Sequence, residues 1–197
     1  MAAYGGVEMS KAVMISIRPK WCEKICSGEK TIEVRKTRPK LETPFKCHIY
    51  ETQGKTDTPW VDEDGHMIFS GRGKVIGEFT CDRIYEIRKR GIPENFDYCY
   101  LSLNGWGNDD IEVEIKAISA SCVSKEELNT YGTKAPFLYG WHISNLKIYD
   151  TPKELGEFER PYECDLCTAK WASECNACHD NGKIKRPPQS WCYVEEM

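Results

Sequence analysis

Residues 27–36 read Ser-Gly-Glu-Lys-Thr-Ile-Glu-Val-Arg-Lys, and this stretch carries the strongest signal for fold and function. Gly28 is the expected end of a helix, because glycine readily adopts the left-handed conformation that follows a last helical turn. A strand then begins, and Ile32 and Val34 share one of its faces because strand side chains alternate. Glu33 and Arg35 lie on the other face, so one face packs on a core and the other is polar.

The polar face of this strand places a carboxylate and a guanidinium two residues apart, with the Lys30 ammonium at the start of the strand. Such an arrangement suits a site that grips a polar, anionic group and keeps a titratable acid beside it. A solvated strand face, whose charges pair across the sheet, is the alternative.

The helix expected before Gly28 is amphipathic. Trp21 and Ile25 fall on one helical stripe, with Cys22 beside them. Pro19 stands where the first turn of a helix tolerates proline. The segment therefore predicts a short helix that packs one side on the core and leads directly into the charged strand.

The spacing Gly28-x-Lys30-x-x-Glu33-x-Arg35 resembles the G-x-K-x-x-E-x-R signature of the ASCH domain, which is related to PUA domains. Further segments follow in the expected order: an opening strand over 13–19, a middle strand over 73–79 and a closing segment over 139–144. The resemblance is to the type found in prophage regions of Firmicutes. The division it implies is an N-terminal tail (1–10), an ASCH domain (11–150) and a C-terminal extension (151–197).

The resemblance implies a mostly β, α+β fold, namely a PUA-like, partly open β-barrel with a few short helices. It also implies that RNA or nucleotides bind in a basic cleft beside the signature. The residues expected to bind the ligand are Lys20, Lys30, Glu33, Arg35 and Trp141.

A hydrolase that uses the same cleft is the alternative function, either a ribonuclease or an amidohydrolase of modified nucleosides. Lys30 and Glu33 would then be catalytic, with Lys30 stabilising charge and Glu33 acting as acid or base. In relatives that hydrolyse acylated nucleosides, a nucleophilic threonine stands at the position of Glu33. A covalent threonine mechanism is therefore not expected for this chain.

Charge is distributed unevenly along the chain. The 197 residues carry a net charge of −4, yet residues 11–46 hold ten basic and four acidic residues, a local net charge of +6. This asymmetry favours one basic face on an acidic body, although basic residues at strand ends also keep small sheets soluble. The chain shows neither a signal peptide nor the roughly 20 apolar residues that cross a bilayer, so we expect a cytoplasmic protein without a membrane partner.

Cysteines cluster in the C-terminal extension. Two C-x-x-C pairs, formed by Cys164, Cys167, Cys175 and Cys178, have the pattern of a tetrathiolate zinc site and predict a small knuckle with structural Zn²⁺. His179 or Cys192 could replace one of the four ligands. An iron–sulfur cluster and unligated thiols are the alternatives. A zinc knuckle also leaves open a second alternative function, that of a protein-interaction adapter.

Other segments predict the remaining elements. Residues 45–50 alternate as a strand, 75–85 and 111–118 have strand character, 52–72 form a polar loop or hairpin, 93–108 form a turn-rich insertion and 137–149 form a long closing strand. Ser124 and Glu127 form a capping box that opens a short helix. Trp191 and Tyr193 lie in the tail, where they either stack on nucleobases or anchor the tail on the barrel.

Overall fold

The structure is a computed structural model that describes residues 11–53, 60–61, 67–68, 72–90, 97–102, 118–133, 135–160 and 183–195. Its strands are β1 (Lys11–Ile17), β2 (Ile32–Arg35), β3 (Phe45–Glu51), β4 (Trp60–Val61), β5 (Met67–Ile68), β6 (Lys74–Cys81), β7 (Ile84–Arg90), β8 (Asp97–Ser102), β9 (Phe137–His142), β10 (Ser144–Lys153) and β11 (Trp191–Glu195). The helices are α1 (Pro19–Cys26), α3 (Lys125–Gly132) and the short 3₁₀ helix η2 (Leu155–Glu157).

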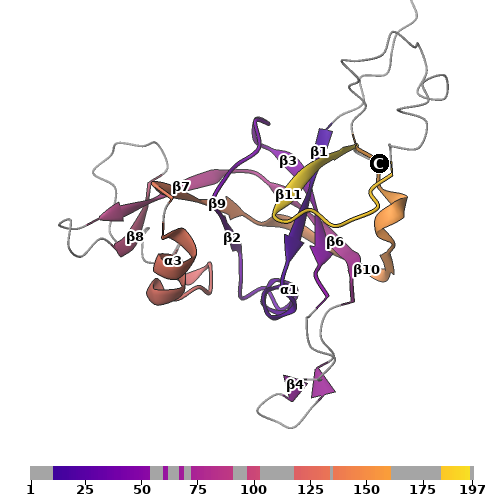
Figure 1. The fold of residues 1–197 in the computed structure, drawn as a ribbon, viewed down its shortest axis with the longest axis horizontal. Coiled ribbons are helices and arrows are strands. Elements are labelled where there is room, and N and C mark those ends of the chain that lie inside the picture. The colour runs from indigo at the N-terminus through magenta and orange to yellow at the C-terminus, as the bar shows by residue number, and fades with distance from the viewer. Residues whose placement is uncertain are drawn as a thin grey trace, which may run out of the picture.

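The strands form two main sheets and a small hairpin (Figure 1). Sheet A has the order β10-β6-β3-β1-β11, and sheet B has the order β2-β9-β7-β8; β4 pairs with β5. Only the β1–β3 pairing is parallel among the described strands. The chain passes from one sheet to the other between β6 and β7 and again between β9 and β10. The sheets adjoin without closing into a barrel, and the expected mostly β, α+β fold is confirmed.

Strand β1 lies inside sheet A and is buried on both faces. Val13, Ile15 and Ile17 belong to a core that also contains residues of α1, β3, β6 and β9. Ala12 and Met14 point to the opposite face, where a second cluster forms with the end of the chain. Burial on both faces explains why this strand is apolar almost throughout rather than alternating.

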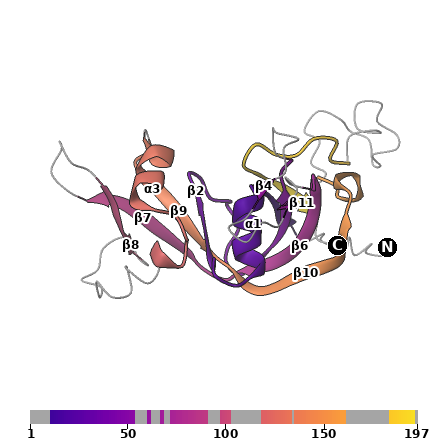
Figure 2. The ribbon, with the colours of Figure 1, turned by 90° about the horizontal axis from the view of Figure 1, so that it is seen from below.

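Sheet B packs one face against α3 (Figure 2). Ile32 and Val34 of β2 contact a cluster that includes Leu128 of the helix. This agrees with the face predicted from alternation. Ser124 caps α3 as expected, because its hydroxyl accepts from the Glu127 N–H and the Glu127 carboxylate accepts from the Ser124 N–H.

The C-terminal extension completes the fold. Strand β11 pairs antiparallel with β1, and Phe158, Ile184 and Val194 fill the second cluster on sheet A. The aromatic side chains of the tail anchor it, since the Trp191 ring centroid lies 6.0 Å from that of Trp141 and 5.4 Å from that of Tyr193. The expected division at residue 150 falls within β10. The end of β10 and the whole of β11 belong to the same sheet as β1, so the extension shares a sheet with the preceding residues.

Several elements differ from their predicted bounds. The strand expected over 75–85 is interrupted at 82–83, and that over 137–149 is interrupted at Ile143 and continues to Lys153. Both breaks are the points at which the chain changes sheets, which a single alternating pattern does not reveal. Residues 97–102 form β8 within the expected insertion, because they pair with β7. Residues 111–117, part of an expected strand, lie outside the described residues.

None of the helices in the described ranges is long and apolar enough to span a membrane.

Candidate functional site

A cleft of about 850 Å³ opens beside β2, the edge strand of sheet B. Four segments and Thr52 line it; the segments are the end of β1 with the start of α1, the residues from Lys30 to Arg35, helix α3 with the preceding Val123, and residues 187–190. The signature residues Lys30, Glu33 and Arg35 all lie in its wall. The structure therefore brings together three of the five residues that the sequence proposed for ligand binding.

The end of α1 sets the direction in which Lys30 enters the protein. Gly28 has φ +79°, the left-handed conformation that favours glycine, and its N–H donates to the Ile25 carbonyl at 3.0 Å. The Lys30 N–H then donates to the Lys24 carbonyl at 2.8 Å. This tight turn reverses the chain, so the lysine side chain points inward rather than along the helix surface.

Lys30 is the buried cation of the site, with only 1% of its surface exposed. Its Nζ donates to the carbonyls of Ile32 at 2.8 Å and Ser121 at 2.6 Å. It also lies 3.3 Å from Glu33 Oε2 and 5.0 Å from the centroid of the Trp21 ring. The ammonium thus fixes the backbone of the site and the position of Glu33, so its main contacts are within the protein.

Glu33 connects the two cations. The residue is 4% exposed, and its Oε1 lies 3.1 Å from Arg35 Nη2. The same Arg35 nitrogen donates to the Ser16 carbonyl at 2.5 Å. The solvated strand face that the sequence left as an alternative is wrong, because Lys30 and Glu33 are buried, Arg35 is mostly buried, and the three charges are joined in one network.

Two polar atoms of this network lack a hydrogen-bond partner within the structure. They are Glu33 Oε2, an acceptor that has only the ion pair with the Lys30 ammonium at 3.3 Å, and Arg35 Nε, a donor, and both are buried. Leaving such an atom unsatisfied costs about 1–3 kcal/mol. Glu33 and Arg35 both line the cleft, so the site suits a ligand that donates to Glu33 Oε2 beside the Lys30 ammonium and accepts from Arg35 Nε.

Lys20 lies outside this network. Its side chain is 61% exposed, and its Nζ forms an ion pair with Glu127 of α3 at 2.9 Å. It also lies 4.3 Å from the centroid of the Trp21 ring. Because both Glu127 and Trp21 line the cleft, Lys20 stands next to its wall and links α1 to α3.

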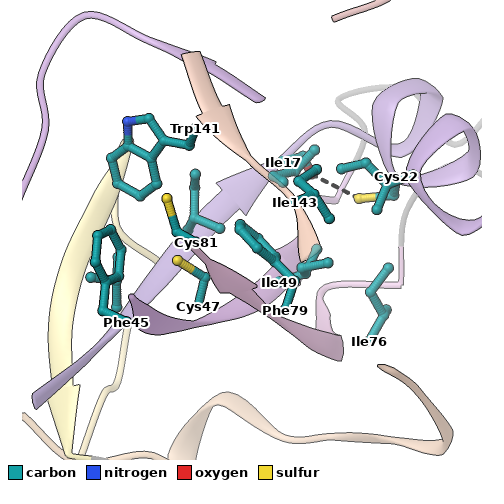
Figure 3. Close-up of a cluster of buried hydrophobic side chains, with 13 residues drawn as sticks. Ile17, Cys22, Phe45, Cys47, Ile49, Ile76, Phe79, Cys81, Trp141 and Ile143 are labelled. Atoms are coloured by element: carbon teal, nitrogen blue, oxygen red, sulfur yellow. Dashed lines mark hydrogen bonds between the residues drawn. The ribbon is translucent and has the colours of Figure 1, made fainter. Parts of the chain in front are cut away.

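The predicted ligand contact of Trp141 needs correction. The residue is completely buried in the main core, where its ring packs edge-on against Phe45 at 5.9 Å (Figure 3). It stands opposite Glu33 in the β2–β9 register, yet it does not line the cleft. A buried ring offers no surface on which a base could stack, so Trp141 shapes the floor beneath the site.

The sequence did not identify two walls of the cleft. Helix α3 contributes Tyr131 among others, and the segment 187–190 closes the side next to β1. Ser16 holds that segment, because its hydroxyl donates to the Pro188 carbonyl at 2.6 Å and its N–H donates to the Ser190 carbonyl at 2.9 Å. The capping box at Ser124 signalled the helix, but no local pattern places it or the tail beside β2.

The Cys22 thiol, one residue after Trp21 of the cleft wall, is not poised for chemistry. Burial, and next the negative charges of Glu51 and Glu33, raise the pKa of Cys22 far above its usual range. A protonated thiol is a poor nucleophile. A covalent cysteine mechanism in this cleft is therefore disfavoured.

The predicted zinc ligands lie outside the described residues, as does His179. Cys192, the spare thiol considered for the same site, lies on β11 and packs partly buried against the second cluster of sheet A. Within the described ranges, no group of three or more His, Cys, Asp or Glu side chains is arranged to hold a metal ion.

Comparison with known proteins shows the fold. No protein-family model matches the sequence, and no curated protein matches it. The solved structure of ASCH from Zymomonas mobilis superposes with a TM-score of 0.52 at 15% identity, covering 94% of this chain and 88% of that one. The structure of a Tyr-to-Phe variant of the same protein gives a TM-score of 0.51 at 15% identity and covers 95% of this chain and 92% of that one. The structure of a Ser-to-Ala variant gives a TM-score of 0.52 at 14% identity and covers 94% of this chain and 89% of that one.

Proposed function

We propose that the protein is an ASCH-type binder of RNA or nucleotides, and that its cleft recognises the edge of a nucleobase. The observation that carries the proposal is the pair formed by Glu33 Oε2, which has an ion pair with Lys30 but no hydrogen bond, and Arg35 Nε, which has no acceptor among the described residues. Nucleobase edges present N–H donors next to carbonyl or ring-nitrogen acceptors, so one base can satisfy both atoms. The shared fold with ASCH from Zymomonas mobilis supports the assignment.

The charges of the site favour a base edge over a phosphate at this position. A carboxylate repels phosphate, and Glu33 stands between the two cations. Lys30 already donates to two carbonyls, which limits what it can offer to a ligand. We therefore assign ligand contact to Glu33 and Arg35, and a positioning role to Lys30.

Conservative substitutions of the two contact residues test this function. Glu33→Gln replaces an acceptor by an amide, and Arg35→Lys keeps the charge but removes Nε. Each should weaken binding about tenfold or more, because about 1.4 kcal/mol corresponds to a factor of ten. The measurement is calorimetric titration with a panel of nucleosides, nucleoside monophosphates and single-stranded RNA.

Exposed residues of the same types provide the controls. Glu29 pairs with Lys24, and Arg72 pairs with Glu51, both at the surface. Glu29→Gln and Arg72→Lys should bind as the wild type does. The proposal is rejected if the site variants, shown to be folded by thermal unfolding, bind every member of the panel as tightly as the wild type.

The hydrolase alternative uses the same two signature residues, Lys30 and Glu33. It requires turnover of RNA or of acylated nucleosides, with Glu33 as acid or base. Under that alternative, Glu33→Gln would lower kcat far more than it lowers affinity. Binding without turnover by the wild type selects the binding function.

We also propose that Cys164, Cys167, Cys175 and Cys178 bind structural zinc. Their paired C-x-x-C spacing supports the proposal, and so do the residues on either side. Glu159 and Lys183 form a β-bridge, and the Ile184 N–H donates to the Phe158 carbonyl at 2.9 Å. The ends of the cysteine-bearing segment therefore lie next to each other.

Metal analysis of protein purified without chelators tests the zinc site. We expect about one zinc per chain, because tetrathiolate sites bind tightly, and we expect chelation to lower the thermal stability. Cys167→Ser should lose the metal, whereas Cys26→Ser, at an exposed free thiol of α1, should retain it. Metal-free wild-type protein would contradict the proposal.

A further inference from the structure

The five residues after β2 form a cationic segment that leads out of the cleft. We call residues 36–40 the basic strap. Lys36, Arg38 and Lys40 alternate along it and are exposed, whereas Pro39 is buried. The strap begins directly after Arg35, which lines the cleft.

Two of the strap cations rest on aromatic rings. Lys36 Nζ lies 4.8 Å from the ring centroid of Tyr131 on α3, and Arg38 Cζ lies 5.9 Å from that of Tyr139 on β9. Tyr131 also lines the cleft, so this end of the strap is continuous with the site. Such contacts keep the charged group in water while the stem covers the ring.

Hydrogen bonds from β11 hold the rest of the strap. The Trp191 indole N–H donates to the Thr37 hydroxyl at 2.9 Å, and the Lys40 N–H donates to the Tyr193 hydroxyl at 2.8 Å. The strap is thus attached to α3, β9 and β11 within five residues. The strap backbone and the charged groups of Lys36 and Arg38 have these contacts before any ligand arrives, which lowers the entropy lost on binding.

The strap cations have no carboxylate partner in the part of the chain that the structure describes. Among the residues that the structure describes, Lys36, Arg38 and Lys40 form no ion pair, whereas surface cations elsewhere, such as Lys24 and Lys74, pair with glutamates. Three exposed positive charges without a neutralising acid create a strong local attraction for anions. Their regular alternation and the adjoining cleft indicate an extended anionic ligand.

We propose that the basic strap binds the phosphate backbone of a single-stranded nucleic acid whose base occupies the cleft at Glu33 and Arg35. This inference rests on the proposed function and adds that the natural ligand is a polynucleotide rather than a free nucleoside. Backbone contacts from exposed cations supply the sequence-independent part of affinity, while the cleft reads one base. A single strand is required, because a paired and stacked base cannot present its edge to a buried cleft.

A double variant of the strap tests the proposal. Lys36→Gln/Arg38→Gln removes two charges but keeps stems that can cover the rings. For a short single-stranded RNA, the affinity at low salt should fall about tenfold or more, and the slope of log K against log salt should shrink by about 1.4, since each phosphate contact contributes about 0.7. Binding of a free nucleoside should be unchanged.

Lys147→Gln/Lys153→Gln is the matched control. Both lysines lie on β10, which forms the other edge of sheet A from β11. The control should bind the short RNA with the affinity and salt slope of the wild type. A loss equal to that of the strap variant would mean that net charge alone determines affinity and would overturn the proposal.

The possible results separate this inference from the proposed function. The strap proposal is rejected if the wild type binds RNA no more tightly than it binds a nucleoside. It is also rejected if polyglutamate competes with the bound RNA as well as unlabelled RNA does. Neither result contradicts base binding in the cleft. If neither nucleosides nor RNA bind in a way that depends on Glu33, both proposals fall. Loss of RNA affinity in the strap variant alone, with nucleoside binding intact, supports both.

Discussion

The continuous stretch from residue 30 to residue 40 contains two groups of charged residues that differ in burial and in their contacts. Lys30, Glu33 and Arg35 are largely buried and joined to one another, whereas Lys36, Arg38 and Lys40 are exposed and contact rings or hydroxyls. Buried charges depend on the few partners that replace water. Exposed charges act over about 8 Å at physiological salt and are screened beyond it.

This difference assigns separate tasks to the two groups. Under the proposed function, the buried group governs which ligand fits, because it contains the donor and the acceptor that lack hydrogen bonds among the described residues. The strap contributes attraction that depends little on the identity of the ligand's bases. Residues that look alike in sequence should therefore differ in stability cost and in salt dependence.

The largest expected effect comes from removing the buried cation. Lys30→Met should lower the free energy of unfolding by about 3–5 kcal/mol, because it removes one of the two cations beside the buried Glu33 and leaves two carbonyls without their donor. Lys36→Met, the matched change in the strap, should cost less than about 1 kcal/mol, the range for an exposed cation–π contact. Denaturant unfolding of both variants measures the difference, and equal costs would contradict the comparison.

Local rules were sufficient to predict much of this region. Alternation placed Ile32 and Val34 together on the core side of the strand, and the helix stop at Gly28 and the capping box at Ser124 are both confirmed. These features depend on residues within four positions of one another. The helix, turn and strand that carry the site therefore follow from sequence patterns alone.

The same local rules could not predict contacts between residues that lie far apart in the sequence. The Ser121 carbonyl that accepts from Lys30 is 91 residues away, and no local pattern shows that the ammonium is already bound. The wall at residues 187–190 comes from the far end of the chain. Sequence patterns placed Trp141 in a strand but did not show that the main core covers its ring, which is why its predicted ligand contact needed correction.

The second effect concerns the boundary between buried and exposed positions along β9. Trp141 is fully buried, whereas Phe137, on the same face four residues earlier, is 38% exposed. Trp141→Phe should lower stability by about 1–3 kcal/mol, because it leaves space in a close-packed core. Ligand affinity should be unchanged in the folded fraction.

Phe137→Leu serves as the control for that change, and its cost should stay within about 0.5 kcal/mol, as for most surface substitutions. Thermal unfolding and ligand titration are measured on both variants. If Trp141→Phe kept full stability but lost binding, the tryptophan would be a ligand residue after all.

A smaller effect is expected at the start of α3, the helix that supports both charged groups. Its Leu128 packs on β2, and its Tyr131 contacts Lys36. Ser124→Ala removes the N-cap hydroxyl and should cost about 1 kcal/mol. Ser124→Asp should restore most of the loss, because aspartate is an equally good N-cap. Failure of Asp to restore stability in denaturant unfolding would show that the cap is not the cause.

The smallest effect tests a residue that belongs to neither group, since Lys20 is exposed yet paired. Its hydrogen bond, followed by that from the Ser124 N–H, lowers the pKa of Glu127 below the usual 4.5. When folding lowers the pKa of a carboxyl group, the group contributes its full stabilisation at a pH above its pKa in the unfolded state. This stabilisation is lost as the pH falls through its pKa in the folded state. Lys20→Met should therefore cost less than about 1 kcal/mol at neutral pH, and nothing once Glu127 is protonated.

Urea unfolding of the wild type and Lys20→Met, at neutral and at strongly acidic pH and at low and high salt, measures this dependence. The cost of the substitution should shrink both on acidification and on addition of salt, because an exposed pair is screened. Lys36→Met, which removes an exposed lysine that contacts a ring rather than a carboxylate, should show no such decline on acidification. If the two variants respond alike to pH, the ion pair between Lys20 and Glu127 contributes nothing to the stability of the protein in solution. Lys20 would then be grouped with the cations of the strap.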